Sequence, residues 1–293
     1  MDFTTLVETR PLVVGDGAMG TQLMARGLAA GRCCELWNVE NPQVVQAVQR
    51  EYVEAGADLL LTNTFGGNPV ALARHGLADR TEELNGAAAA IARRAADGRA
   101  LVVGDIGPTG SLLAPLGELS VAEARDAFRR QAEALVGAGV DAVLCETFQS
   151  GDELRAALEA ARECTDLPLI ASMTFSPEPS GRYRSIMGEA PEAVVGLAER
   201  FACAACGTNC GQGIETMAPL IGQLADLTDL PVIAQPNAGL PRLVGGRAVY
   251  EQAPSVFALH VVRLYESGAR IIGGCDGTTA QHVRALRLFA DSL

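Results

Sequence analysis

Polar side chains follow each of eight short apolar runs in this 293-residue chain. They include two carboxylates, Asp16 and Glu146, and two thiols, Cys210 and Cys275. If the runs are parallel strands of a barrel, their carboxyl ends meet at one rim, and these groups share one small space. A single polar residue after a strand is typical of a turn, whereas eight around one rim indicate a functional site.

Cys210 and Cys275 have the clearest chemistry of these residues. Each comes just after an apolar run, the sixth and the eighth, and both runs neighbour the seventh, so the two sulfurs can approach to metal-ligand distance. Zinc binds thiolates at about 2.3 Å, and a catalytic zinc has three protein ligands and one open position. Asp276 is the natural third ligand. The alternative is that both cysteines are small apolar side chains of the core.

The remaining cysteines and the histidines point to no second site. Cys203 and Cys206 form a C-x-x-C pair, but we place it inside a strand, where residues three apart face opposite sides and cannot serve one ion. We expect Cys145 and Cys164 to pack in the core, and Cys33-Cys34 to lie in a rim loop with a role in closing the site or none. His-based triads and H-E-x-x-H zinc sites are excluded, because the three histidines all fall in helical stretches or at their ends: His75, His260 and His282.

The segment Gly15-Asp16-Gly17-Ala18-Met19-Gly20 matches the G-x-G-x-x-G pattern of dinucleotide-binding turns. That pattern requires a second strand that ends in an acidic residue about 20 residues later. Here the interval holds Cys33-Cys34-Glu35 and Asn41-Pro42, which indicate a loop, so we reject a dinucleotide site. The backbone N–H groups of the turn could still bind a small anion such as a carboxylate.

The elements that position these residues alternate regularly along the chain. The runs are apolar throughout, as in strands that are buried on both faces of a parallel sheet, and Ala-, Leu-, Glu- and Arg-rich helical stretches separate them. The eight predicted strands are residues 11–15, 58–62, 100–104, 141–145, 168–173, 203–208, 231–235 and 270–274. The clearest predicted helices are residues 43–54, 86–97, 121–136 and 152–163.

Eight such units predict an α/β fold, a closed (β/α)8 TIM barrel formed by residues 1–293 as a single domain. An open doubly wound sheet is the alternative. Glycine before three of the strands, as in Ala55-Gly56-Ala57-Asp58 and Ala138-Gly139-Val140-Asp141, suits a helix C-cap. The longest loops, residues 27–40, 176–188 and 236–252, are expected over the rim that carries the chemistry.

Composition limits the function classes. The net charge is −12, which argues against binding of nucleic acid or an anionic membrane, since both require clustered Lys and Arg. No apolar run reaches the 18 or so residues needed to cross a bilayer, and the first ten residues do not look like a signal peptide. Eight scattered cysteines do not form a disulfide scaffold. We therefore expect a reduced, cytoplasmic enzyme.

Taken in order, the strand-end motifs resemble the zinc-dependent homocysteine S-methyltransferase family, and most closely the homocysteine-binding barrel of cobalamin-dependent methionine synthase. The resemblance covers nearly the whole chain. The motifs that carry it are Asp16-Gly17-Ala18-Met19-Gly20-Thr21, Thr62-Asn63-Thr64-Phe65, Gly107-Pro108-Thr109, Glu146-Thr147-Phe148, Asn209-Cys210 and Gly273-Gly274-Cys275.

The resemblance implies a (β/α)8 barrel in which three cysteines hold zinc and the homocysteine sulfur takes the open zinc position and is methylated. It makes Cys210 and Cys275 zinc ligands. Asp276 stands where the family has its third cysteine, so a hard oxygen replaces a soft sulfur. A Cys-Cys-Asp site suits zinc but should leave the bound thiolate a weaker nucleophile. Alternatively, Asp276 turns away, zinc binds weakly and the substrate is not homocysteine.

The resemblance also implies how an amino-acid substrate is held. The backbone near Gly17 and Ala18 would bind its carboxylate, and Glu146, together with Asp16, its ammonium group. The remaining strand-end residues assigned to substrate binding are Thr62, Asn63 and Asn209.

The implied reaction transfers a methyl group to a thiol, most directly to homocysteine to give methionine. The donor would be a small sulfonium, such as S-methylmethionine or S-adenosylmethionine, or a corrinoid on a separate partner protein. One alternative is a methyltransferase component that demethylates a small methylated substrate and passes the methyl group to a corrinoid protein. Another is a regulatory barrel that has lost its zinc.

Overall fold

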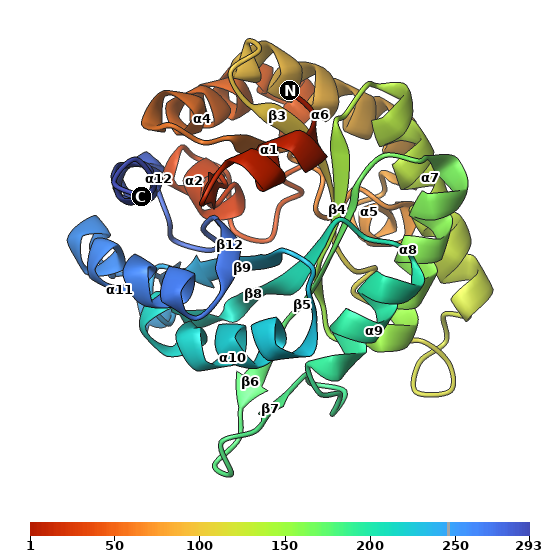
Figure 1. Ribbon diagram of the computed structural model, residues 1–293. Helices are drawn as coiled ribbons and strands as arrows, with labels where there is room; N and C mark the ends of the chain where they lie inside the picture. The colour runs from red at the N-terminus through yellow and green to blue at the C-terminus, as the bar shows by residue number, and fades with distance from the viewer. Residues whose placement is uncertain (245–246) are drawn as a thin grey trace.

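The eight predicted apolar runs form the eight parallel strands of a (β/α)8 barrel in the computed structural model, which describes residues 1–244 and 247–293 (Figure 1). The hydrogen-bonded order is β1-β12-β9-β8-β5-β4-β3-β2, so the predicted TIM barrel is confirmed and the open sheet is wrong. The strands are β1 (Val13–Val14), β2 (Leu59–Leu61), β3 (Leu101–Ile106), β4 (Ala142–Phe148), β5 (Leu169–Met173), β8 (Ala205–Gly213), β9 (Val232–Asn237) and β12 (Ala269–Ile272).

Helices surround the barrel, and the four predicted helical stretches are confirmed as α4, α6, α7 and α8 with ends shifted by a few residues. None of the helices in the described ranges has the length and apolar character to cross a membrane. The helices are α1 (Phe3–Thr9), α2 (Gly20–Ala25), α3 (Trp37–Glu40), α4 (Pro42–Ala55), α5 (Pro69–Ala73), the 3-10 turn η1 (Ala78–Arg80), α6 (Thr81–Ala96), α7 (Val121–Gly137), α8 (Gly151–Cys164), α9 (Glu192–Arg200), α10 (Ile214–Leu227), α11 (Pro254–Glu266) and α12 (Ala280–Ala290).

The barrel closes between β1 and β2 through the side chain of Asp58. The Asp58 N–H donates to the Val14 carbonyl at 2.7 Å, and the Val14 N–H donates back to Asp58 Oδ2 at 2.9 Å. Arg10 and Arg287 each lie 3.2 Å from this buried carboxylate. Gly56 ends α4 just before Asp58 at φ 103°, which confirms the predicted glycine C-cap.

The same arrangement recurs where the sequence repeats it. Gly139 has φ 82° at the end of α7, and two residues later Asp141 N–H donates to the Val102 carbonyl. Asp141 Oδ2 accepts the Val102 N–H at 2.7 Å and pairs with Arg93. Each Ala-Gly-x-Asp segment therefore ends a helix and fastens the next strand to the one before it.

The interior of the barrel is filled by its own apolar cluster, which includes Val13, Leu59 and Ile271. Helix α1, which the sequence analysis did not predict, lies across the amino-terminal end of the barrel (Figure 1). It buries Phe3 and Leu6 in this cluster. Because α1 covers that end, the site must open at the other, where the strands end.

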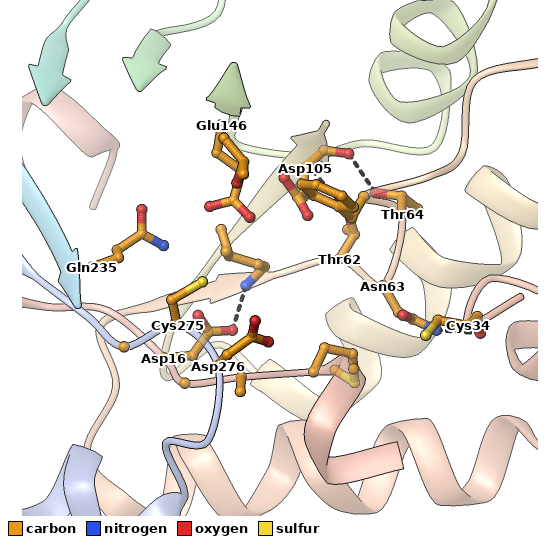
Figure 2. Close-up of a pocket in the computed structure, with 18 of the residues that line it drawn as sticks. Asp16, Cys34, Thr62, Asn63, Thr64, Asp105, Glu146, Gln235, Cys275 and Asp276 are labelled. Atoms are coloured by element: carbon orange, nitrogen blue, oxygen red, sulfur yellow. Dashed lines mark hydrogen bonds between the residues drawn. The ribbon is translucent and has the colours of Figure 1, made fainter. Parts of the chain in front are cut away.

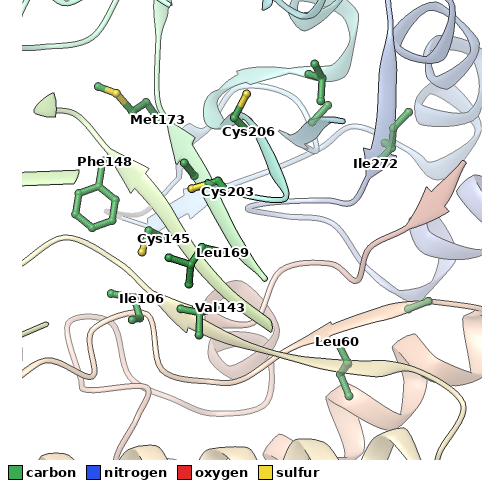
Figure 3. Packing of buried hydrophobic residues seen from close by; sticks show 14 of the residues in the cluster. Leu60, Ile106, Val143, Cys145, Phe148, Leu169, Met173, Cys203, Cys206 and Ile272 are labelled. Carbon is green, nitrogen blue, oxygen red and sulfur yellow. The ribbon is translucent and has the colours of Figure 1, made fainter. Parts of the chain in front are cut away.

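A second apolar cluster lies between the strands and the surrounding helices (Figure 3). Cys145, Cys203 and Cys206 are buried in it. Our placement of the C-x-x-C pair was wrong, since β8 begins at Ala205 and Cys203 precedes it, so the strand alternation that we invoked does not apply. Both thiols pack in the same layer as apolar side chains.

The three long loops predicted over the rim contain small elements. Helix α3 lies within residues 27–40, a β6 (Ser176–Pro177) and β7 (Tyr183–Arg184) hairpin within 176–188, and a β10 (Arg242–Val244) and β11 (Arg247–Val249) hairpin within 236–252.

Candidate metal and substrate site

A cavity of about 230 Å³ opens at the carboxyl ends of the strands (Figure 2). Nine of the ten predicted site residues line it, and Asn209 does not. The nine are Asp16, Gly17, Ala18, Thr62, Asn63, Glu146, Cys210, Cys275 and Asp276.

Cys210, Cys275 and Asp276 bring their sulfur and oxygen atoms within 4.8 Å of one another. Cys210 lies inside β8 rather than beyond it, where the register with β9 shifts between Asn209 and Gly213. Its φ of 60° is uncommon for a residue other than glycine, and such irregularities often re-aim a side chain toward a site. Two sulfurs and one oxygen at this spacing fit a zinc ion with an open fourth position.

The two thiols differ in pKa. The Cys275 thiol donates a hydrogen bond to Cys210, which lowers the pKa of Cys210 to about 7 despite its burial. The same hydrogen bond and burial raise the pKa of Cys275 well above its usual value. Cys210 is thus the first of the pair to be available as a thiolate.

Two neighbours of these ligands were not identified from the sequence. Asn237, at the end of β9, directs its amide N–H toward Cys210 Sγ at 3.9 Å. The Tyr250 hydroxyl donates to Asp276 Oδ2 at 3.0 Å. Asn237 comes shortly after the predicted strand 231–235, so its position gave a signal that we did not use. Nothing in the sequence distinguished Tyr250 within its long loop.

Four buried carboxylates line the cavity, two more than we counted from the sequence. One is Glu35, whose oxygens accept the Gly66 N–H and the Cys33 thiol. The other three are Glu146, Asp16 and Asp105 (Figure 2).

Burial, with the nearby Asp16 carboxylate, raises the pKa of Glu146 to about 8, and burial raises the pKa of Asp16 to about 7. Burial and the Glu146 charge raise the pKa of Asp105 well above its usual value. One buried oxygen of Asp105 and one of Glu146 have no hydrogen-bond partner among the residues that the structure describes. The cavity is therefore suited to a cation such as an ammonium group.

Asp16 also belongs to the frame of the barrel. Its Oδ2 accepts the backbone N–H of Leu61 in β2 at 2.8 Å, and its carbonyl accepts the N–H of Gly274. These two contacts hold the end of β1 against β2 on one side and against the loop that carries Cys275 on the other.

The comparisons with known proteins agree with this geometry. The family model described as homocysteine S-methyltransferase matches residues 13–289. The chain belongs to this family.

Two methionine synthases are among its relatives in this family. The protein from Mycobacterium tuberculosis (strain H37Rv) is 36% identical over 298 residues, which cover 95% of this chain and 24% of that protein. The one from Mycobacterium leprae is 35% identical over 303 residues, or 96% of this chain and 24% of its own length. The chain thus spans about a quarter of each of these relatives.

A solved structure also matches this chain over nearly its whole length. The metallated form of the homocysteine methyltransferase MmuM from Escherichia coli superposes with a TM-score of 0.79 at 28% identity. The match covers 97% of this chain and 98% of that one.

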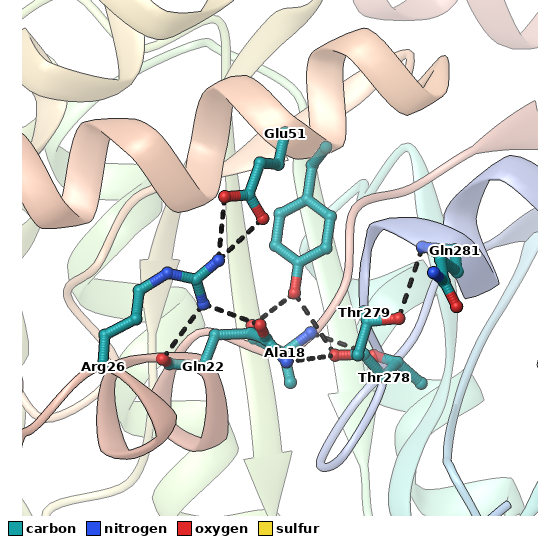
Figure 4. A network of polar contacts seen from close by, with 8 residues as sticks. Ala18, Gln22, Arg26, Glu51, Thr278, Thr279 and Gln281 are labelled. Carbon is teal, nitrogen blue, oxygen red and sulfur yellow. Dashed lines mark hydrogen bonds and ion pairs between the residues drawn. The ribbon is translucent and has the colours of Figure 1, made fainter. Parts of the chain in front are cut away.

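Two residues, Tyr52 and Thr278, hold the turn at Gly17 and Ala18 that carries the family resemblance. Figure 4 shows Ala18 beside Thr278. The Tyr52 hydroxyl donates to the Ala18 carbonyl at 2.6 Å, and the Ala18 N–H donates to Thr278 Oγ1 at 3.0 Å. A side chain on Gly17 would lie 2.8 Å from the Tyr52 ring. The Ala18 N–H therefore already donates to another residue of the protein. Its predicted contact with a substrate carboxylate stays a prediction.

Two of the predicted substrate contacts from the polar strand ends are tied into the wall of the cavity. Thr62 Oγ1 accepts the Asp105 N–H, and Asn63 donates its amide to the Cys34 carbonyl and to Asn38 Oδ1. Cys34, which we left without a definite role, lines the cavity, and burial raises the pKa of its thiol to about 12.

Asn209 supports the site from behind. Its Oδ1 accepts the Thr147 N–H at 2.9 Å and the Ser172 hydroxyl at 2.7 Å, and its Nδ2 donates to Thr147 Oγ1 at 2.6 Å. Thr147 has φ 63°, a strained value for threonine. In this structure Asn209 joins β8 to β4 and β5 and holds Thr147 at the cavity wall, and its contact with a substrate stays a prediction.

Proposed function

We propose that this protein methylates the sulfur of homocysteine in a zinc-dependent reaction. One observation carries the proposal: a ligand group of two thiols and one carboxylate and a set of four buried carboxylates line the same small cavity. The first suits a thiol-binding metal, and the second suits the ammonium group of an amino acid. The family membership and the homocysteine methyltransferase named among its structural neighbours support the same substrate.

In this proposal Cys210, Cys275 and Asp276 hold the zinc ion. A bound zinc ion supplies Lewis acidity, which lowers the pKa of a coordinated thiol so that the thiolate is present at neutral pH. Glu146 and Asp16 bind the substrate ammonium and orient the amino acid so that its sulfur faces the ligand group. The ammonium lowers the pKa of both carboxyl groups from the raised values of the free protein and favours their ionised forms.

The carboxylate of the amino acid lies on the other side of the same cavity in this arrangement, next to the turn at Gly17 and Ala18. Backbone N–H groups that are not engaged within the protein bind carboxylates well at such turns. Thr62 and Asn63 hold the opposite wall in place. Fixing both ends of the amino acid leaves its thiol one position, in line with an incoming methyl group.

The decisive experiment removes the ligands one at a time. We expect the wild-type protein to contain one zinc per chain and to form methionine from homocysteine and S-methylmethionine. Cys210→Ala and Cys275→Ala should lose the zinc and reduce turnover by more than about a hundredfold, because a ligand matters at least as much as the groups that support it. Elemental analysis and methionine formation are measured on the same samples.

Cys164→Ala provides the control, because this thiol lies at the end of α8 and donates to the Ala160 carbonyl. It should retain both zinc and turnover. Full retention of both by the Cys210 and Cys275 variants would contradict the proposal. With cobalt in place of zinc, homocysteine should add a sulfur-to-cobalt charge-transfer band, and 4-mercaptobutyrate, which lacks the ammonium group, should bind far more weakly.

A second candidate is demethylation of a small methylated substrate with transfer to a separate corrinoid protein. It is favoured by an apolar groove of about 390 Å³ beside the cavity, which shares Thr147 with it. Exposed side chains of Leu112, Leu116, Ile186 and Met187 line this groove and suit a partner that carries the methyl group. Transfer of a methyl group from a methylated substrate to added cob(I)alamin, giving methylcobalamin and the demethylated substrate without any thiol methylation, would favour this candidate over the first.

A further inference from the structure

We propose that Tyr250 positions Asp276 as the third metal ligand and so allows an aspartate to serve where a thiolate would need no such support. This inference rests on the metal site of the proposed function. It assigns Tyr250 as a positioning residue that acts on the metal through Asp276.

The two oxygens of the Asp276 carboxylate have different surroundings. The Tyr250 hydroxyl donates to Oδ2 at 3.0 Å, and in the described part of the chain it is the sole side chain that does so. A carboxylate oxygen of Asp276 also falls within 4.8 Å of the sulfurs of Cys210 and Cys275. A tyrosine on one oxygen leaves the other for the metal, which favours binding through a single oxygen. A cysteine ligand binds through its single sulfur and leaves no further atom that needs a hydrogen-bond partner.

The loop that carries Asp276 is shaped to receive the tyrosine. A side chain on Gly277, the next residue, would lie 2.2 Å from Tyr250 Cβ, so only a glycine allows the tyrosine to approach this closely. Gly277 has φ 81°, and its N–H donates to Thr21 Oγ1 at 3.1 Å. The tyrosine therefore packs against the turn directly after the ligand.

The chain on the other side of Tyr250 is fastened to the same loop. The Gln252 N–H donates to the Ala238 carbonyl at 3.2 Å, and the Ala238 N–H donates to the Asp276 carbonyl at 2.8 Å. Gln252, two residues after Tyr250, is thus linked through Ala238, the residue directly after β9, to the backbone of Asp276. This short path limits how far the Tyr250 hydroxyl can move from the carboxylate.

The negative charge of the site makes the hydrogen bond from Tyr250 to Asp276 important for metal binding. Two thiolates and a carboxylate place three negative charges on one ion, with Asp16 and Glu146 in the same cavity. A neutral O–H group stabilises the carboxylate without adding a cation that would compete with the metal. Partners of this kind orient a ligand, and their removal typically costs 10- to 100-fold in metal affinity.

The test is a double-mutant cycle on zinc affinity, measured by competition with a chelating dye. Tyr250→Phe in the otherwise wild-type protein should weaken zinc binding by about tenfold. In an Asp276→Cys background, where no carboxylate remains, the same change should have no effect. In the cobalt-substituted protein Tyr250→Phe should shift the ligand-field bands of the wild type and leave those of the Asp276→Cys protein unchanged.

Two controls separate a positioning role from a structural one. Tyr183→Phe removes a hydroxyl from the β6–β7 hairpin and should leave zinc affinity unchanged, and the metal-free unfolding midpoint of Tyr250→Phe should equal that of the wild type. Unchanged zinc affinity in Tyr250→Phe, or an equal loss in both backgrounds, would overturn the inference alone. A wild-type protein that binds no zinc would overturn the proposed function and this inference with it.

Discussion

Asp105 shows at the scale of a residue what burial does to a charged group. Its carboxyl group is 5% exposed, makes no hydrogen bond through one oxygen and faces the Glu146 carboxylate. Burial, followed by the Glu146 charge, raises its pKa well above the usual value. A cationic substrate relieves this cost, whereas the empty protein retains it.

This shift predicts how stability depends on pH. The folded Asp105 retains its proton at pH values where the unfolded chain releases it, so the folded state binds more protons and loses stability as the pH rises above about 4. Asp105→Asn removes that loss. We expect the free energy of unfolding of the variant to match that of the wild type at pH 4 and to exceed it at pH 8, by on the order of 1 kcal/mol or more.

Urea unfolding of chelator-treated, substrate-free protein at both pH values measures this difference. Asp229→Asn is the control, because Asp229 is exposed and should give no pH-dependent gain. A constant difference between Asp105→Asn and the wild type at pH 4 and pH 8 would contradict the assignment.

The turn between β1 and α2 has no room for a side chain at Gly17. It must pass between Tyr52 and Thr278, and Gly17 leaves room for both. Gly17→Ala would push the turn away from Tyr52, so we expect a loss of about 1–3 kcal/mol in the free energy of unfolding, the usual cost of overpacking.

Gly86→Ala is the matched change, because Gly86 lies inside α6 with no atom within 4 Å of an added Cβ. It should stabilise the protein by up to about 1 kcal/mol through helix propensity. The two variants, compared by chemical unfolding and by homocysteine affinity, should differ in sign for stability, and only Gly17→Ala should weaken binding. Equal effects would show that the close approach to Tyr52 is not important.

Closure of the barrel is a property of the whole molecule, and it depends on Asp58. This side chain is 8% exposed and pairs with Arg287, which is 18% exposed. Asp141 makes the same backbone contacts between β3 and β4, but it is 28% exposed, its Arg93 partner is 44% exposed, and the two strands also share a ladder of paired residues.

We therefore expect the same substitution to differ in cost at the two positions. Asp58→Ala should lower the free energy of unfolding by about 3 kcal/mol, because it removes the buried carboxylate that binds the Val14 N–H, Arg10 and Arg287 where the barrel closes. Asp141→Ala should cost about 1 kcal/mol, as is usual for exposed pairs. Urea titrations of both variants in the same buffer measure this difference, and an equal cost would contradict the role of Asp58 in closure.

The sequence by itself determined the order of the barrel and most of the wall of its site. Apolar runs of strand length that end in polar residues predicted eight parallel strands, and parallel strands of a barrel place their carboxyl ends at one rim. This rule brought Asp16, Glu146, Cys210 and Cys275 to one cavity without knowledge of any side-chain contact. The repeated Ala-Gly-x-Asp segments were equally readable, because a glycine C-cap is a local property of the backbone.

Only the tertiary structure decided contacts between residues far apart in the chain. Asn209 and Thr62 both lie at the carboxyl ends of their predicted strands. Packing directs the Asn209 side chain away from the cavity toward Thr147, whereas Thr62 lines the cavity. Asp105 directly follows the predicted strand 100–104, but its position opposite Glu146 depends on how the strands are staggered. Tyr250 reaches Asp276 across 26 residues through a hairpin whose path no local pattern fixes. Side-chain direction and long-range hydrogen bonds depend on the packed barrel, since many rotamers are open to each residue until its neighbours are in place.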